Sequence, residues 1–221
     1  MPERADYQRD LSVSFNSVGD LYCALGEADQ ARDAYRASLA IRERLAAAEP
    51  DLATYQRDLC VSHDRLGDLH RTQGELDHAR EAYLQALAIA ERLAAAEPSR
   101  ADYQRNLSVA YSKVGTLHRV LGQHDRAREA YLHSLVIAER LAAADPERAD
   151  YRRDLMISLL QASTDDQPGG ADLLTRAAAV LETLQRDNLV IPTDETVVTS
   201  LNQMLRARGL SGRVVRHPPH P

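Results

Sequence analysis

The chain has 221 residues, a formal net charge of −6 and 44% hydrophobic residues, with no tryptophan. Its charges are spread as mixed-sign pairs, which argues against general nucleic-acid binding, because that function normally requires a basic excess. No apolar run approaches the ~18 residues of a membrane span, and Met1 leads directly into a charged stretch rather than a secretory signal. These features predict a soluble, helical protein of the cytoplasm.

Three near-copies of a block of about 48 residues follow one another, and a fourth copy begins and then loses the pattern. The copies occupy residues 5–52, 53–100 and 101–148, and the fourth starts at residue 149. A period of this length is typical of a solenoid, in which each unit buries its apolar face only by stacking on its neighbours. The chain is therefore predicted to offer an extended binding surface.

Each block is predicted to form two antiparallel helices of about 20 residues. In the first block, apolar residues recur at spacings of three and four until Gly26, which is expected to end the first helix. The second helix is expected to begin near Asp29 and to end at Ala48, because Pro50 disfavours a helical residue before it. The stripe of the first helix consists of Tyr7, Leu11, Phe15, Val18, Tyr22 and Leu25.

The pattern within each block resembles the tetratricopeptide repeat: a large residue, a Leu-Gly-like pair and an aromatic on the first helix, then Ala, an aromatic and a small residue. Glycines in mid-helix cost about 1 kcal/mol each against alanine, so close helix packing is expected around them. The matching residues are Phe15, Val18, Gly19, Tyr22, Ala31, Tyr35 and Ser38, then His63, Leu66, Gly67, His70, Ala79, Tyr83 and Ala86, then Tyr111, Val114, Gly115, His118, Ala127, Tyr131 and Ser134.

The resemblance covers residues 5 to about 163 and implies an all-α fold, a right-handed α-solenoid of antiparallel helix pairs. The usual repeat of this family has about 34 residues, and the surplus of about 14 residues equals two turns added to each helix. Such long repeats resemble those of bacterial multidomain signalling, protease and nucleotide-hydrolase proteins, where they serve as sensor or docking arms.

The C-terminal part is predicted to cap the repeat array of residues 1–163. Residues 164–210 are interpreted as a degenerate repeat with capping helices, the last from about Thr193 to Arg208. A separate docking element is the alternative, since this final helix is amphipathic. Residues 211–221 are expected to form a disordered tail, whose His217 and His220 lack carboxylate or thiol neighbours for a metal site.

The resemblance also implies a concave face made by the first helices, and this is the predicted partner-binding site. One arginine per repeat is predicted to form a ladder for carboxylates or phosphates, namely Arg9, Arg57, Arg105 and Arg153. The alternative is that Asp6, Asp102 and Asp150 pair with these arginines as ordinary surface salt bridges, which leaves Arg57 the least neutralised. The predicted site consists of Arg9, Asn16, Asp20, Arg57, Asp64, Asp68, Arg71, Arg105, Ser112, Arg119 and Arg153.

No catalytic, phosphate-binding or metal-binding motif is found, so neither enzymatic activity nor a cofactor or metal is expected. His70 and His118 replace an aromatic residue at equivalent places and are interpreted as core or half-core residues. Cys23 and Cys60 lie eleven residues out of phase in their repeats, about 16 Å apart along parallel helices, and are predicted to be free thiols.

The predicted function is a non-catalytic scaffold or adaptor that binds a peptide or helical segment of another protein in the concave groove. One alternative is a regulatory module that senses a small peptide or an anionic ligand through its arginines. Another is end-to-end self-assembly, because the first helix keeps the apolar stripe of the internal copies with no polar cap before it. That N-terminal face is therefore a candidate for pairing with a second copy.

Overall fold

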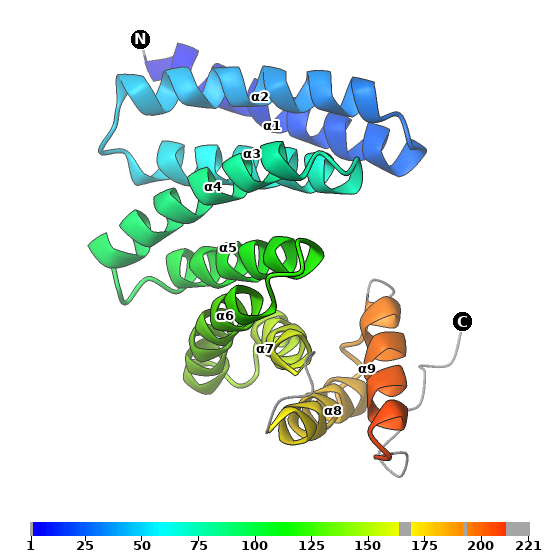
Figure 1. The fold of residues 1–221 in the computed structure, drawn as a ribbon. Coiled ribbons are helices and arrows are strands. Elements are labelled where there is room, and N and C mark those ends of the chain that lie inside the picture. Colours follow the sequence, from blue (N-terminus) through cyan, green and yellow to red (C-terminus); the bar gives the residue numbers. More distant parts are fainter. Residues whose placement is uncertain (1, 164–168, 192–193, 211–221) are drawn as a thin grey trace. The chain divides into compact units, whose positions relative to one another are not determined.

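The structure is a computed structural model that describes residues 2–163, 169–191 and 194–210, with side chains from residue 5 onward. All regular structure within these ranges is helical (Figure 1). None of the helices in these ranges is both long and apolar enough to cross a membrane. The expected all-α fold is confirmed.

The first compact unit ends at Leu121 and contains two complete helical hairpins and the first helix of a third. Each helix packs on the helix before it and the helix after it, as a stacked array requires. The helices are α1 (Pro2–Leu25), α2 (Ala28–Ala48), α3 (Ala53–Thr72), α4 (Leu76–Ala96) and α5 (Ala101–Val120).

A glycine in the left-handed conformation closes each hairpin turn of this unit. Gly26 has a φ of +76°, and the amide of Glu27 donates to the carbonyl of Tyr22 at 2.9 Å across it. Gly74 repeats this φ, and the amide of Glu75 donates to the carbonyl of His70. These bonds satisfy carbonyls at the helix ends and turn the chain back, so the predicted stop at Gly26 is confirmed.

Close packing within each hairpin depends on a glycine that faces a tyrosine. A Cβ added at Gly19 would lie 2.4 Å from Tyr35, and one at Gly67 would lie 2.5 Å from Tyr83. Both distances are too short for real carbon contacts, so only glycine lets the two helices approach this closely. The expected compensation for a mid-helix glycine is confirmed at these two positions.

The second compact unit begins at Gly122 and has a core rich in leucine. Helix α7 ends at Ala162, earlier than α3 or α5 end in their repeats, at the point where the fourth copy loses the pattern. The fully buried residues of this core are Met156, Leu159, Leu174, Leu181, Leu184, Val198, Leu201 and Leu205. The helices are α6 (His124–Ala144), α7 (Ala149–Ala162), α8 (Gly170–Arg186) and α9 (Glu195–Ala207).

The two compact units divide the chain inside the third predicted repeat, between α5 and α6. The predicted boundary between the repeat array and its cap lies elsewhere, after residue 163, where the repeated sequence pattern ends. That boundary stays a prediction. The predicted tail of residues 211–221, with His217 and His220, lies outside the described residues, as do residues 164–168.

Candidate functional site

A hollow of about 650 Å³ lies between α1 and α3, and we call it the α1/α3 groove. Its lining comes from the C-terminal halves of these helices and from the start of α2, and it includes Asp20, Cys23, Tyr35, Arg65, Asp68 and Gln73. Two of the predicted concave-face residues, Asp20 and Asp68, therefore contribute to one concave surface. The groove combines carboxylates, an arginine, a thiol and aromatic carbon.

The two groove carboxylates have the same environment, shifted by one repeat. Asp20 on α1 accepts a hydrogen bond from the Tyr35 hydroxyl at 2.7 Å and pairs with Arg65 on α3 at 3.0 Å. Asp68 on α3 likewise accepts from the Tyr83 hydroxyl at 2.7 Å and pairs with Lys113 on α5. Each aspartate thus connects its own hairpin to the first helix of the next repeat.

These carboxylates raise the pKa of the tyrosines from which they accept hydrogen bonds. Burial and the neighbouring negative charge of Asp20 raise the pKa of Tyr35, and burial with the charge of Asp68 raises the pKa of Tyr83. Both hydroxyls therefore remain donors at neutral pH. The aspartates that the sequence indicated for partner binding are also structural residues of the array.

Asp64, one helical turn before Asp68 on α3, differs from these paired aspartates. Its Oδ1 is buried, and no group in the described part of the chain donates a hydrogen bond to it. Burial raises the pKa of Asp64 to about 6; Lys113 and Arg65 oppose the shift, and Asp68 adds to it. A buried carboxylate oxygen without a donor favours the protonated form of the group.

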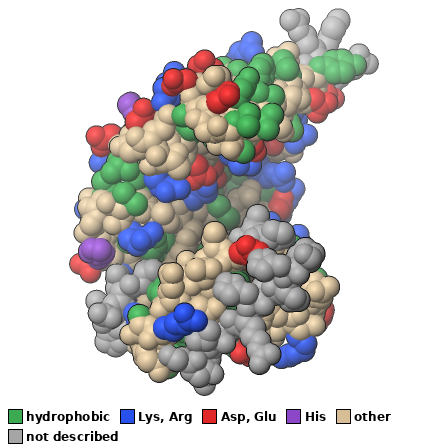
Figure 2. All heavy atoms as spheres, turned by 90° about the vertical axis from the view of Figure 1, so that its right-hand side faces the viewer, with side chains coloured by type: hydrophobic (Ala, Val, Ile, Leu, Met, Phe, Trp, Pro, Cys, Tyr) green, Lys and Arg blue, Asp and Glu red, His purple; other side chains and the backbone are tan. Residues whose placement is uncertain are grey.

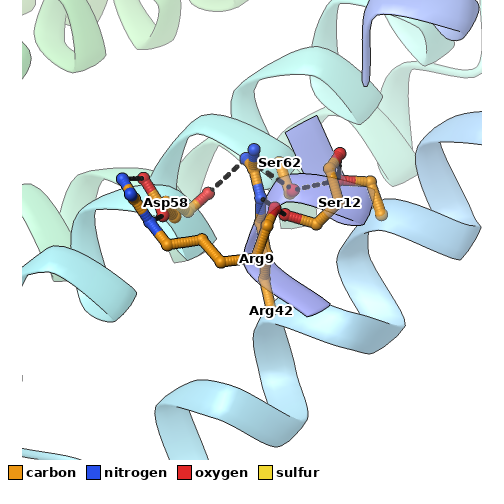
Figure 3. A network of polar contacts seen from close by, with 6 residues as sticks. Arg9, Ser12, Arg42, Asp58 and Ser62 are labelled. Atoms are coloured by element: carbon orange, nitrogen blue, oxygen red, sulfur yellow. Dashed lines mark hydrogen bonds and ion pairs between the residues drawn. The ribbon is translucent and has the colours of Figure 1, made fainter. Parts of the chain in front are cut away.

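A buried arginine holds the first two hairpins together through neutral oxygens (Figure 3). Arg42 on α2 donates to Ser12 on α1 at 3.0 Å and, on α3, to the carbonyl of Asp58 at 2.7 Å and to Ser62 at 3.1 Å. Its side chain points into the junction in Figure 3, beside the ion pair of Arg9 and Asp58. Burial lowers the pKa of Arg42.

One predicted binding residue belongs to this buried junction. Asn16 was expected on the exposed concave face, and that expectation is wrong, because only 7% of its surface is accessible. With its amide oriented to satisfy both neighbours, it donates to Ser38 Oγ at 2.9 Å and accepts from Arg42 Nη1 at 3.0 Å. Its role in the described structure is to complete the shell around Arg42.

Three of the four ladder arginines form ion pairs within the fold, with partners that the sequence did not indicate. Arg9 pairs with Asp58 at 2.6 Å, and Arg57 pairs with Asp102 at 3.3 Å, in each case in the following repeat. Arg153, in the second unit, pairs with Asp194 at 3.0 Å. The sequence suggested partners three residues earlier on the same helix for Arg9 and Arg153 and no such partner for Arg57, whereas the structure pairs each of the three with a residue outside its own helix. Binding of an external anion by the ladder stays a prediction.

The remaining predicted residues occupy different places in the first unit. Arg71 opposes the rise in the pKa of Tyr83, whose hydroxyl donates to the groove aspartate Asp68. Arg105, Ser112 and Arg119 lie on α5 and engage other groups there. The sequence analysis missed Arg65 and Lys113, although a signal was present: each cation follows its aspartate by the same number of residues in two successive repeats.

The comparison with protein families identifies the repeats. Residues 10–92 match the tetratricopeptide repeat. This segment of the chain carries tetratricopeptide repeats. The matched residues cover most of the first two of them, which supply α1–α4 and the α1/α3 groove.

Comparison with solved structures agrees on the fold. The structure of BtubC (BKLC) from P. vanneervenii superposes with a TM-score of 0.63 and 18% sequence identity, over 97% of this chain and 85% of that one. The structure of MamA aligns with 17% identity over 82% of this chain and 98% of the other, and its TM-score of 0.35 is too low to carry an argument. A comparison with curated proteins found no match.

The two cysteines of the first two tetratricopeptide repeats are free, as predicted, and they differ in access. Cys23 is exposed in the α1/α3 groove, where its sulfur lies 3.5 Å from the Tyr35 hydroxyl. Cys60 is 2% exposed, and burial raises its pKa to about 12. Only the groove thiol is therefore positioned to react with a reagent in solution.

Helix α1 exposes apolar side chains whose counterparts are buried in the later tetratricopeptide repeats. Tyr7 is 71% exposed, whereas Tyr55 and Tyr103 at the same place in the next repeats are 7% and 2% exposed. Leu21 is 59% exposed, and its counterpart Leu69 is 4% exposed. Figure 2 views the molecule from the right-hand side of Figure 1. It shows hydrophobic side chains gathered in its upper part, at the level where Figure 1 places α1 and α2. We call the exposed surface, formed by Tyr7, Leu11, Val18, Leu21 and Leu25, the α1 apolar face.

Proposed function

We propose that this chain is a non-catalytic scaffold that binds a segment of another protein in the α1/α3 groove. The family supports the general function, because tetratricopeptide repeats mediate protein–protein interactions. The observation that carries the proposal is the groove itself, a hollow of about 650 Å³ lined by Asp20, Asp68, Arg65 and the ring of Tyr35. Clefts of this size that combine apolar surface with a few polar groups are typical binding sites.

The groups around the groove favour a segment that donates hydrogen bonds. Asp20 and Asp68 retain acceptor capacity beyond their tyrosine and cation partners, because an ionised carboxylate offers about four lone-pair positions. We therefore expect a bound segment to carry lysine, arginine or free backbone N–H groups toward α3.

The reactivity of the two cysteines provides a direct test. Peptides selected from a random display library on the native protein are measured again after a bulky maleimide is attached to Cys23, which lines the groove. Cys60 is buried and is not expected to be labelled. We expect labelling at Cys23 to weaken the selected peptides at least about tenfold, since it fills their site.

A matched control separates blocking of the groove from a general effect of the label. Cys23→Ser combined with Ala47→Cys moves the same maleimide to an exposed position near the end of α2. Peptides that bind the groove should keep their affinity for this labelled variant. If the selected peptides bind equally well after labelling at Cys23, the groove is not the interaction site.

A second candidate function, self-assembly, is favoured by the α1 apolar face. Leu21 and Tyr7 are exposed here, while their counterparts in the next repeats are buried. A second copy that covers this face would remove several large apolar side chains from water, at about 25 cal/mol per Å².

The other predictions about function and location remain open. The ligand-sensing alternative requires the ladder arginines to bind an external anion. Three of them, Arg9, Arg57 and Arg153, already form ion pairs within the fold. The cytoplasmic location agrees with two free thiols in a chain that forms no disulfide between them.

A further inference from the structure

Three side chains with metal-ligating atoms converge at the turn between α3 and α4. His70 lies in the last turn of α3, Glu75 directly precedes α4, and His78 lies in the first turn of α4. One ligand atom from each of the three lies within 4.8 Å of the other two. The turn at Gly74 creates this arrangement, because it brings the end of one helix beside the start of the next.

The atoms that converge are two imidazole nitrogens and one carboxylate oxygen. Nδ1 of His70 is hydrogen-bonded to Oε2 of Glu75, and Nδ1 of His78 lies 4.0 Å from the same oxygen. The two rings lie with their centroids 5.2 Å apart. Two histidines and one carboxylate form a common set for Zn²⁺, with a water molecule in the fourth position.

Small side-chain movements would bring these atoms to ligand distances. A tetrahedral Zn²⁺ with bonds of about 2.0–2.1 Å needs its ligand atoms about 3.3–3.4 Å apart. His78 is 69% exposed and free to rotate toward Glu75, whereas His70 is held in place by burial. The ion would replace the hydrogen bond between His70 and Glu75, and the helices need not move.

The neighbours of Glu75 leave its Oε2 atom available to a metal ion. Arg32 on α2 approaches the other oxygen of Glu75, Oε1, at 3.2 Å, and it also donates to Gln73. The positive charge of Arg32 opposes a second cation, but Asp29 pairs with Arg32 at 3.2 Å and offsets it. Arg32 thus orients Glu75 from behind, in the way that outer hydrogen bonds orient metal-ligating carboxylates.

The second repeat alone carries this combination of residues. The equivalent positions are Tyr22, Glu27 and Gln30 in the first repeat, and His118, Gln123 and Arg126 in the third. Two of the three ligands are therefore absent from the first and third repeats, although the turns are otherwise alike. The trio belongs to one turn and is not part of the repeat pattern. The equivalence of His70 and His118 in the sequence therefore does not indicate it.

We propose that His70, Glu75 and His78 bind one Zn²⁺ ion at the α3/α4 turn. The ion would link the end of α3 to the start of α4 and, through Glu75 and Arg32, to α2 of the preceding hairpin. It would lie at the margin of the α1/α3 groove, since Gln73 lines that groove. Its open position, occupied by water, faces solvent on the side of the exposed His78.

Titration of the metal-free chain with Zn²⁺ tests this site. The background carries His217→Ala and His220→Ala, so that the terminal histidines add no nitrogen ligands. Isothermal titration calorimetry should give one ion per chain, and Co²⁺ should give the visible absorption of a four- or five-coordinate site. His78→Ala and Glu75→Gln should each weaken Zn²⁺ binding by about 100-fold or more, because each removes a ligand.

Controls distinguish a built site from casual binding. His124→Ala, which removes an exposed histidine from α6, should leave the stoichiometry and affinity unchanged. Saturating Zn²⁺ should raise the melting temperature of the parent protein and not that of His78→Ala. Because His78 is exposed, its replacement leaves the fold intact. The proposal is overturned if the parent chain binds no stoichiometric Zn²⁺, or if His78→Ala binds it as tightly.

Discussion

Arg42 donates to the main-chain carbonyl of Asp58 at 2.7 Å, and this bond joins α2 of the first hairpin to α3 of the second. The guanidinium is 4% exposed and is surrounded by hydroxyl and carbonyl oxygens. The next two repeats have alanine at the same position, Ala90 and Ala138, and both are buried. Two successive junctions of near-identical repeats therefore use different chemistry.

Replacing Arg42 with alanine should destabilise the protein by about 2–4 kcal/mol, because Ser12, Ser62 and the Asp58 carbonyl lose their donor and a cavity forms. Urea unfolding followed by circular dichroism measures the loss. Adding Ser12→Cys and Ser62→Ala to Arg42→Ala reproduces the residues of the second junction, Cys60, Ala90 and Ala110. This triple variant should recover most of the stability, and the exposed Arg44→Ala should change little. A triple variant no more stable than Arg42→Ala would contradict this account.

Gly67→Ala should destabilise the second hairpin by about 1–3 kcal/mol, although alanine favours a helix by about 1 kcal/mol. The reason is steric, since the new Cβ would lie 2.5 Å from the ring of Tyr83. Thermal unfolding of the single and double variants with Tyr83→Leu measures the coupling. The loss from Gly67→Ala should shrink once the ring is removed; additive losses would show that the glycine matters for another reason.

Asp64 should make the stability of the protein fall as the pH rises from about 4 to about 6. Its pKa is about 6 in the fold and near 4 in an unfolded chain, so the folded state binds more protons in this window. The protonated form of Asp64 is the more stable form in this buried site. Above pH 6 the ionised form lowers the free energy of unfolding by an amount on the order of 2 kcal/mol. Asp64→Asn should therefore stabilise the protein relative to the parent at pH 7 and much less at pH 4.

Chemical denaturation at both pH values tests this, with the exposed Asp51→Asn as the control. The charged neighbours Lys113, Arg65 and Asp68 remain present in both variants. An equal effect of Asp64→Asn at pH 4 and pH 7 would mean that the carboxylate does not titrate in this range.

Leu21→Glu should abolish self-association without unfolding the protein, because Leu21 is 59% exposed on the α1 apolar face. Light scattering over a range of concentrations compares it with the parent chain. Leu84→Glu places the same charge at an apolar residue of α4 that is 48% exposed, and it should leave the oligomeric state unchanged. A parent chain that is monomeric at every concentration would exclude the self-assembly function.

The hairpins could be predicted from the sequence because their signals are local. Gly26 and Pro50 mark helix ends within a few residues, and the recurrence of Gly19 with Tyr35 indicates close packing. The site residues could be predicted only in part, because their environment depends on neighbouring helices. Asp20 and Asp68 do line the groove, but Asn16 is buried by Arg42, which the sequence presents as one charge among several on α2.

The ion pairs show the same limit. Helix periodicity places Asp102 on the same side of α5 as Arg105, but it contains no information about Arg57, which reaches Asp102 from the preceding repeat. The trio at the α3/α4 turn was likewise hidden, since its residues become neighbours only when Gly74 reverses the chain.

The buried guanidinium of Arg42 also bears on how a chain of near-copies avoids mispairing. Repeats this similar invite a hairpin to dock on the wrong neighbour, within one chain or between two. If α2 stacked on α5 in place of α3, Ala110 would replace Ser62 and Asn106 would replace Asp58, so Arg42 would lose one of its two hydroxyl acceptors and Arg9 its carboxylate. A buried or half-buried charge that loses a partner costs free energy, so Arg42 and Arg9 together disfavour the slipped arrangement and favour the native order of the first two repeats.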